Sequence, residues 1–109
     1  MTLDQMRRVH NNWDSYGAPA PNRVAIQAAQ RVLDALQHAG LKPDRIVPSA
    51  EGGVGIVFFR GDRYADFECF NDGGVLIGMS DRTGNPIVRE VRPDQPIGPE
   101  IERVRRFIR

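Results

Sequence analysis

Apolar residues recur at helical spacing at the start of the chain. Thr2 followed by Gln5 has the form of a capping box, which predicts a helix that begins at Leu3 and runs for about three turns. The run Gly17–Pro21 contains two prolines, which cannot continue a helix, and therefore predicts an extended connector. The apolar stripe of this first helix consists of Leu3, Met6, Val9 and Trp13.

A second and longer amphipathic segment follows the connector. Asn22 is a favourable N-cap and predicts a helix that continues to about Ala39. Gly40 supplies a left-handed stop, and Pro43 prevents the helix from resuming. Alanines make the apolar stripe narrow, and such small residues allow a helix to lie close to a sheet. The stripe consists of Ala25, Ala28, Ala29, Val32, Leu33 and Leu36.

After Asp44 the apolar positions alternate with polar ones, which is typical of strands. Clusters of glycine, asparagine and aspartate divide this region and predict turns between the strands. We expect the last strand to lie at an edge of the sheet. The predicted strands are Arg45–Pro48, Val54–Arg60, Arg63–Phe70, Val75–Ser80 and Ile87–Val91.

The second and third strands are predicted to form a hairpin with a defined register. Gly61-Asp62 is a two-residue hairpin signal that places Arg60 opposite Arg63. This register gives one wholly apolar face, which must meet the helices because apolar side chains avoid water. The other face is mixed, with an apolar end and an acidic end. The apolar face carries Val54, Ile56, Phe58, Ala65, Phe67 and Cys69, and the mixed face includes Phe59, Tyr64, Asp66 and Glu68.

A last helix is predicted after Pro99, because proline is tolerated in the first turn. Its buried stripe is expected to be Ile101, Val104 and Ile108, and Glu102 and Arg106 have the spacing of an i, i+4 ion pair. The fold class is therefore α+β in one domain, residues 1–109. It comprises two N-terminal helices, a four- to five-stranded antiparallel β-meander and a C-terminal helix, with the helices on one face of the sheet.

Composition limits the classes of function that we consider. The chain has 109 residues, 40% of them hydrophobic and 27% charged, with a formal net charge of +1, so no global field attracts nucleic acid or anionic lipid. Fourteen of the fifteen cationic residues are arginine. The N-terminal residues form no apolar run, and no apolar stretch approaches the ~20 residues of a membrane span. We therefore expect a cytoplasmic protein without a membrane partner.

The segment Asn12-Trp13-Asp14-Ser15-Tyr16-Gly17-Ala18 is the one distinctive motif. It resembles the pattern Asn-Trp-Asp-Gly-Tyr-Gly-Ala of an uncharacterised family of short bacterial and phage proteins, with Ser15 in place of the commoner glycine. The similarity covers roughly residues 3 to 78. It implies an α+β fold with a β-meander and a prokaryotic or phage setting, and it implies no established activity.

The residues of the motif also have a structural interpretation of their own. Asp14 is placed to accept backbone N–H groups at Tyr16 or Gly17 in an Asx-type turn. Gly17 would allow a backbone conformation that is closed to other residues, and Trp13 would anchor the first helix and the connector to the core. We expect Tyr16 to bury its ring. This structural role of Asn12, Trp13, Asp14, Tyr16 and Gly17 is favoured over the alternative, in which the motif lines a recognition pocket.

The sequence contains few residues in patterns that support catalysis. His10 and His38 lack a second ligand at i+3 or i+4, and the single Cys69 is expected to point inward, so we predict no metal site and no cofactor. His10 and Asp14 would share the first helix four residues apart, which resembles a base with an orienting carboxylate. Such a pair at a helix end is more often a surface contact, so no catalytic residue is assigned.

Three hypotheses of function remain open. The first is a non-catalytic accessory factor of a prokaryote or phage that binds another protein, of the antitoxin, immunity or anti-defence inhibitor type. The second is nucleic-acid binding through the C-terminal arginines, and the third is a small hydrolase-like enzyme that uses His10 and Asp14. The chain would be a monomer, or a homodimer through the edge strand. The predicted partner-binding residues are Phe59, Tyr64, Asp66, Glu68, Arg103 and Arg106.

Overall fold

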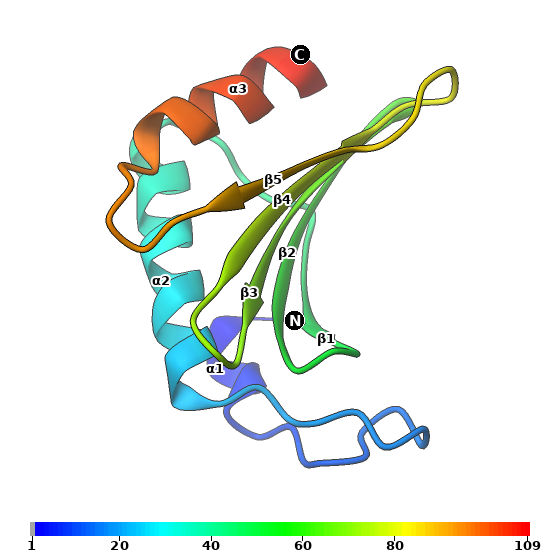
Figure 1. Cartoon of the computed structure of the whole chain (residues 1–109), viewed down its shortest axis with the longest axis vertical. Coiled ribbons are helices and arrows are strands. Elements are labelled where there is room, and N and C mark those ends of the chain that lie inside the picture. The colour runs from blue at the N-terminus through cyan, green and yellow to red at the C-terminus, as the bar shows by residue number, and fades with distance from the viewer. Residues whose placement is uncertain (1) are drawn as a thin grey trace.

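The structure is a computed structural model, and it describes residues 2–109. It has an α+β fold in which three helices lie against one face of a five-stranded antiparallel sheet, as the sequence predicted (Figure 1). The strands follow one another across the sheet in chain order, so the sheet is a meander. The elements in chain order are α1 (Leu3–Met6), α2 (Arg23–His38), β1 (Arg45–Ser49), β2 (Gly53–Arg60), β3 (Arg63–Phe70), β4 (Val75–Ser80), β5 (Ile87–Val91) and α3 (Gly98–Ile108).

Helix α2 begins and ends where its sequence signals predict. The Asn22 side chain accepts a hydrogen bond from the Ala25 N–H at 2.9 Å and so caps the first turn. At the other end Gly40 adopts a φ of 71°, and the Leu41 N–H returns to the Leu36 carbonyl, which closes the helix with a left-handed residue. The described helices within residues 2–109 include none that is long and apolar enough to cross a membrane.

The predicted register of the β2–β3 hairpin is confirmed. Arg60 pairs with Arg63 around the Gly61-Asp62 turn, and Gly53 pairs with Phe70 at the far end. The inward-facing side chains are therefore those that the alternation predicted. Phe58, Phe67 and Cys69 are fully buried.

The hydrophobic core lies between the sheet and helices from both ends of the chain. Helix α2 contributes a stripe of small and branched residues, with Leu36 fully buried at its end. Helix α3 covers another part of the same face with its predicted stripe. The α3 stripe is Ile101, Val104 and Ile108, of which Val104 is fully buried.

The first helix is much shorter than predicted. The capping box between Thr2 and Gln5 is present, but α1 ends at Met6 rather than continuing to Trp13. The side chains of Asn11, Asn12 and Asp14 accept hydrogen bonds from backbone N–H groups between residues 16 and 20, which holds this segment in a closed loop and competes with helix formation. Asn12 has a φ of 65°, which a continuing right-handed helix cannot contain.

Asn71, in the turn between β3 and β4, joins that turn to the N-terminal connector. Its side chain accepts a hydrogen bond from the Asn22 N–H at 2.9 Å and donates one to the Ala20 carbonyl at 3.0 Å. Its own N–H donates to the Gly52 carbonyl in the β1–β2 turn. One residue therefore holds the start of α2 and two turns of the sheet together.

Candidate functional site

The sheet face opposite the helices has no helical cover within residues 2–109, and we call it the open face (Figure 1). The strand register places apolar, aromatic and acidic side chains on it, together with the basic Arg45 at the β1 edge. All of the sheet residues that the sequence predicted to bind a partner lie here. The side chains of the open face are Arg45, Val47, Ser49, Val57, Phe59, Tyr64, Asp66, Glu68, Phe70, Leu76, Ser80, Val88 and Glu90.

Asp66 lies at the centre of the open face and is held by two donors. The Tyr64 hydroxyl donates to Asp66 Oδ2 at 3.0 Å, and the Gly78 N–H donates to Asp66 Oδ1 at 3.1 Å. Burial raises the pKa of the Asp66 carboxyl above its ordinary value, although both hydrogen bonds act in the opposite direction. Burial and the nearby Asp66 charge raise the pKa of Tyr64 to about 12. Asp66 is therefore a fixed and partly desolvated carboxylate.

Glu68 is fixed toward the opposite edge of the sheet. The Ser49 hydroxyl of β1 donates to Glu68 Oε1 at 2.8 Å, so the Glu68 side chain reaches across β2. Gly53 and Gly55 of β2 lie between Ser49 and Glu68 in the register. Gly53 also has a φ of 147°, and a Cβ there would lie 2.0 Å from the Cys69 carbonyl oxygen.

An aromatic pair occupies the end of the open face next to Asp66. The Phe59 and Tyr64 rings meet edge to face, with centroids 5.4 Å apart and an interplanar angle of 62°. Phe59 remains 50% exposed. The open face thus combines an exposed aromatic group with two positioned carboxylates.

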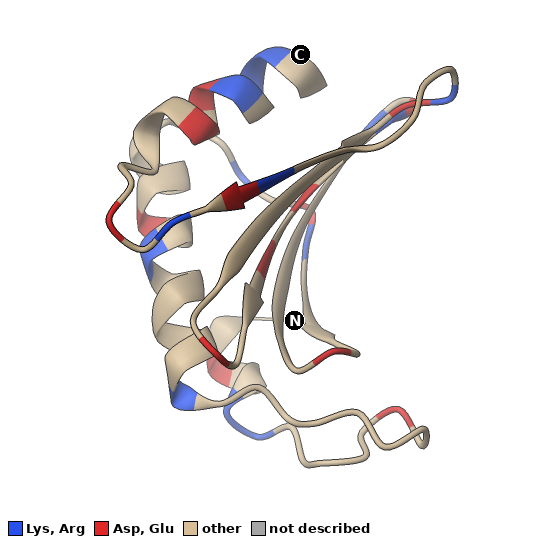
Figure 2. Cartoon of the chain, viewed as in Figure 1, with Lys and Arg blue, Asp and Glu red and all other residues tan. Residues whose placement is uncertain are grey.

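The predicted arginines of α3 lie on the other side of the molecule, beside β5. Arg103 and Arg106 line a groove with a volume of ≈ 440 Å³, and Arg63 and Arg89 complete its basic rim. Figure 2 shows acidic segments along β3, and both acidic and basic segments along α3 and β5. We call this the arginine groove, and it is lined by Arg63, Met79, Ile87, Arg89, Arg103, Arg106 and Phe107.

Glu100 organises the arginines at one end of the groove. Its carboxylate is only 3% exposed and accepts hydrogen bonds from Arg89 at 3.0 and 3.1 Å, with Arg103 Nε at 3.7 Å. The bond from Arg89 lowers the pKa of Glu100 below its ordinary value. The predicted ion pair between Glu102 and Arg106 is wrong, because Glu102 instead pairs with Arg105 at 3.1 Å.

The motif at residues 12–18 forms a loop closed by its own side chains. Asp14 Oδ1 accepts the N–H groups of Tyr16 at 2.9 Å and Ala18 at 3.0 Å, and these bonds lower the pKa of Asp14. Gly17 donates to Asn12 Oδ1 at 2.7 Å instead of to Asp14. The expected Asx-type turn at Asp14 is therefore confirmed for the Tyr16 N–H.

Two aromatic residues of the motif do not behave as predicted. Tyr16 is 93% exposed rather than buried, because the tight turn around it directs its ring into solvent. Trp13 lies outside the hydrophobic core, and its indole N–H donates to the Pro19 carbonyl at 3.2 Å. Trp13 therefore fastens the loop to the connector rather than to the core.

The arrangement predicted for a base and its orienting carboxylate is not formed. His10 lies beyond the end of α1, and Asp14 directs one oxygen to two backbone N–H groups. Within residues 2–109 no group of three His, Cys, Asp or Glu side chains is placed to hold a metal ion. Cys69 is fully buried, and this burial raises its pKa to about 12, which disfavours the reactive thiolate.

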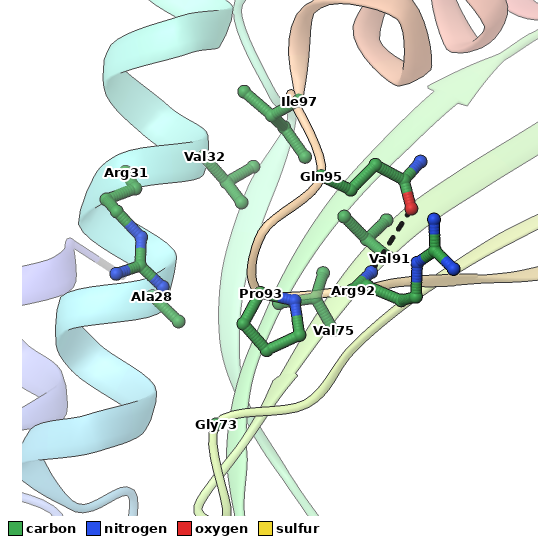
Figure 3. Close-up of a pocket in the computed structure, with 10 residues that line it drawn as sticks. All are labelled: Ala28, Arg31, Val32, Gly73, Val75, Val91, Arg92, Pro93, Gln95 and Ile97. Carbon is green, nitrogen blue, oxygen red and sulfur yellow. Dashed lines mark hydrogen bonds between the residues drawn. The ribbon is translucent and has the colours of Figure 1, made fainter.

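A smaller pocket of ≈ 200 Å³ lies between α2 and the connection from β5 to α3. Figure 3 shows the guanidinium groups of Arg31 and Arg92 on opposite sides of this pocket, with Val32, Val75 and Pro93 between them. The charged groups thus do not converge on one point. The pocket is a small and mainly apolar slot, and we assign no ligand to it.

Comparisons of the chain with protein-family models, with curated proteins and with solved structures gave no match. The assignment of the candidate sites therefore rests on their geometry alone. Several of their residues were missed from the sequence, because each acts through a partner distant in the chain. These residues are Ser49, Gly78, Arg63 and Arg89, together with Glu100 as a buried partner of arginine.

Proposed function

We propose that this chain is a non-catalytic binding factor that docks another protein on its open face. The observation that carries this proposal is the state of Asp66 and Glu68, which are held by other side chains on a sheet face without helical cover. Positioned groups lose little conformational entropy on binding, so their interactions contribute more to affinity. An exposed Phe59 and a half-buried Tyr64 add the aromatic contacts that are common in interface cores.

The chemistry of the open face favours a partner that presents arginine or lysine among apolar residues. Asp66 and Glu68 are two residues apart on β3, so both carboxylates point outward from the same strand. Val57 and Leu76 flank them on the neighbouring strands. A guanidinium that reaches this position would exchange water for charged hydrogen bonds in a partly desolvated site.

The type of accessory factor that we propose is an antitoxin, an immunity protein or an anti-defence inhibitor of a prokaryote or phage. The motif at residues 12–18 supports this setting through its resemblance to short bacterial and phage proteins. Factors of these types act by occupying a surface of a partner. The proposed role accordingly requires a stable face and no chemical step.

The experiment is affinity capture from a lysate of the native cell, with the full chain as bait. The wild-type chain is compared with Phe59→Ala and with Glu68→Lys, and Asp62→Lys in the exposed β2–β3 turn is the matched control. We expect the wild type and the Asp62→Lys control to retain the same protein, which both open-face variants release. Circular dichroism spectra and melting temperatures establish that each variant is folded.

Phe59→Ala keeps the test valid if Glu68→Lys disturbs the sheet, because Phe59 is half exposed and its truncation removes little core packing. Retention of the same partner by all four chains, at equal salt concentration, would exclude the open face as the docking surface. Retention of nucleic acid alone, released by nuclease treatment, would exclude the protein-binding function itself.

A further inference from the structure

Strand β5 has one free edge that borders the arginine groove. It is the last strand of the sheet and pairs only with β4, so the backbone groups on its outer side have no sheet partner within residues 2–109. Ile87 and Val88 are 49% and 63% exposed. The opposite edge strand, β1, contains Pro48, which has no N–H to donate. The β5 edge is therefore the better template for an added strand.

The groove would receive the side chains of such an added strand. Ile87 and Arg89 of β5 point toward the helix-covered side and form one wall of the groove, and Arg103 and Arg106 of α3 form the other. The inward side chains of a strand paired to β5 point in the same direction as those of Arg89. They would therefore lie next to Arg89, on the side of the sheet where the two α3 arginines line the groove.

The charge in the groove is positive and only partly neutralised. Arg89 and Arg103 share the carboxylate of Glu100. Arg106 has no ion-pair partner within residues 2–109. The groove thus favours carboxylates or phosphates, since the planar guanidinium binds both in a bidentate manner.

The apolar floor of the groove distinguishes these two kinds of ligand. Met79 and Phe107 line it, and the Arg63 guanidinium lies 5.5 Å from the centroid of the Phe107 ring. A phosphate backbone gains little from aliphatic walls, whereas a peptide carries both acidic and apolar side chains. A free strand edge likewise offers N–H and C=O groups that pair with a peptide backbone, whereas nucleic acid has no amide backbone to pair with them.

We propose that the β5 edge and the arginine groove together bind an extended acidic segment of a partner protein. The segment adds to the sheet as a sixth strand and places its inward carboxylates on Arg103 and Arg106. The inference rests on the proposed function in that the partner is a protein, but it does not depend on the open face. The two surfaces would give the domain two separate points of contact with its partners.

The first test measures binding of a synthetic probe to the full chain by fluorescence anisotropy. The probe is a fluorescein-labelled heptapeptide in which glutamate and valine alternate, and the control probe carries glutamine in place of glutamate. We expect the glutamate probe to bind at least about tenfold more tightly than the glutamine probe, because its charges meet the arginines. The double variant Arg103→Gln/Arg106→Gln should weaken binding of the glutamate probe by about tenfold or more. Arg8→Gln, at an exposed arginine that does not line the groove, should leave it unchanged.

Equal affinity for the two probes, or equal affinity of all three chains for the glutamate probe, overturns the inference. Glu68→Lys and Phe59→Ala, which test the open face, should leave probe binding unchanged. The failure of one proposal is therefore distinguishable from the failure of the other. A single-stranded DNA oligonucleotide that binds more tightly than the glutamate probe, and does so through the same arginines, would instead assign the groove to nucleic acid.

The second test addresses strand addition itself. Two versions of the glutamate probe carry N-methyl groups on alternate amides, so that each version blocks one edge of the extended peptide. Only one edge of the peptide can pair with β5, so we expect one version to lose binding and the other to retain most of it. Equal binding by the two versions would rule out addition to the sheet.

Discussion

The substitution Gly78→Ala tests how Asp66 is held on the open face. An added Cβ would lie 2.6 Å from Asp66 Oδ1, which is closer than these atoms can approach, so the carboxylate must move. The movement would break the hydrogen bonds from the Gly78 N–H and the Tyr64 hydroxyl. Gly78 has no left-handed φ, so alanine causes no backbone strain there.

The expected loss of stability follows from these contacts. A hydrogen bond to a charged group contributes about 1.5 kcal/mol at the lower end of its range, so two such bonds contribute about 3 kcal/mol. Asp66 is only half-buried, and hydration of the displaced carboxylate recovers roughly half of the free energy of these two hydrogen bonds. Alanine in a strand regains about 0.5 kcal/mol relative to glycine. The net loss is about 1 kcal/mol, or a fall in Tm of roughly 5 °C.

The assay is urea denaturation at pH 7, arranged as a double-mutant cycle with Asp66→Ala. Once the carboxylate is absent, Gly78→Ala should become neutral or slightly stabilising. Gly98→Ala is the control, since a Cβ there meets nothing within 4 Å. An unchanged cost of Gly78→Ala in the Asp66→Ala background would refute the reasoning, because the cost would then come from the backbone and not from Asp66.

Three further predictions concern the fold. Gly53→Ala should destabilise the domain by about 3 kcal/mol or more in urea denaturation, because its Cβ would lie 2.0 Å from the Cys69 carbonyl oxygen. Glu100→Gln should cost about 1–2 kcal/mol at pH 7. The pKa of Glu100 in the folded state lies below 4.5, so the ionised carboxylate stabilises the fold above pH 4.5. This stabilisation is lost as the pH falls through the lowered pKa. The difference in unfolding free energy between Glu100→Gln and wild type should therefore be smaller at pH 3 than at pH 7. Cys69 should resist alkylation by iodoacetamide at pH 8 in the native domain and react fully in urea, because it is buried and its pKa is raised to about 12. Rapid alkylation of the native domain would contradict its burial.

The parts of the fold that depend on neighbouring residues could be predicted from the sequence. The Asn22 cap, the Gly40 stop and the Gly61-Asp62 turn act over a few residues, and all three are confirmed. The extent of α1 could not be predicted in this way. The apolar stripe continues to Trp13, but the side chains of Asn12 and its neighbours hydrogen-bond to the backbone of a closed loop and end the helix early.

The candidate sites were only half visible in the sequence. Alternation along β3 shows that Asp66 and Glu68 share a face, and the structure agrees. It does not show that Ser49 lies two strands away within reach of Glu68, or that Gly78 donates to Asp66. The arginine groove could not be predicted from strand alternation, because its residues come from β5 and α3, which meet only after the chain has folded.

The core is closed by helices from opposite ends of the chain. Helix α2 is synthesised before the sheet that it covers, whereas α3 is synthesised after the last strand. Until α3 leaves the ribosome, the sheet positions that meet Ile101 and Val104 are exposed to water. The nascent domain then presents an apolar surface that is prone to aggregation. Emergence of α3 is therefore the step that completes the core of this domain, and chains that stop before residue 98 should aggregate or be degraded.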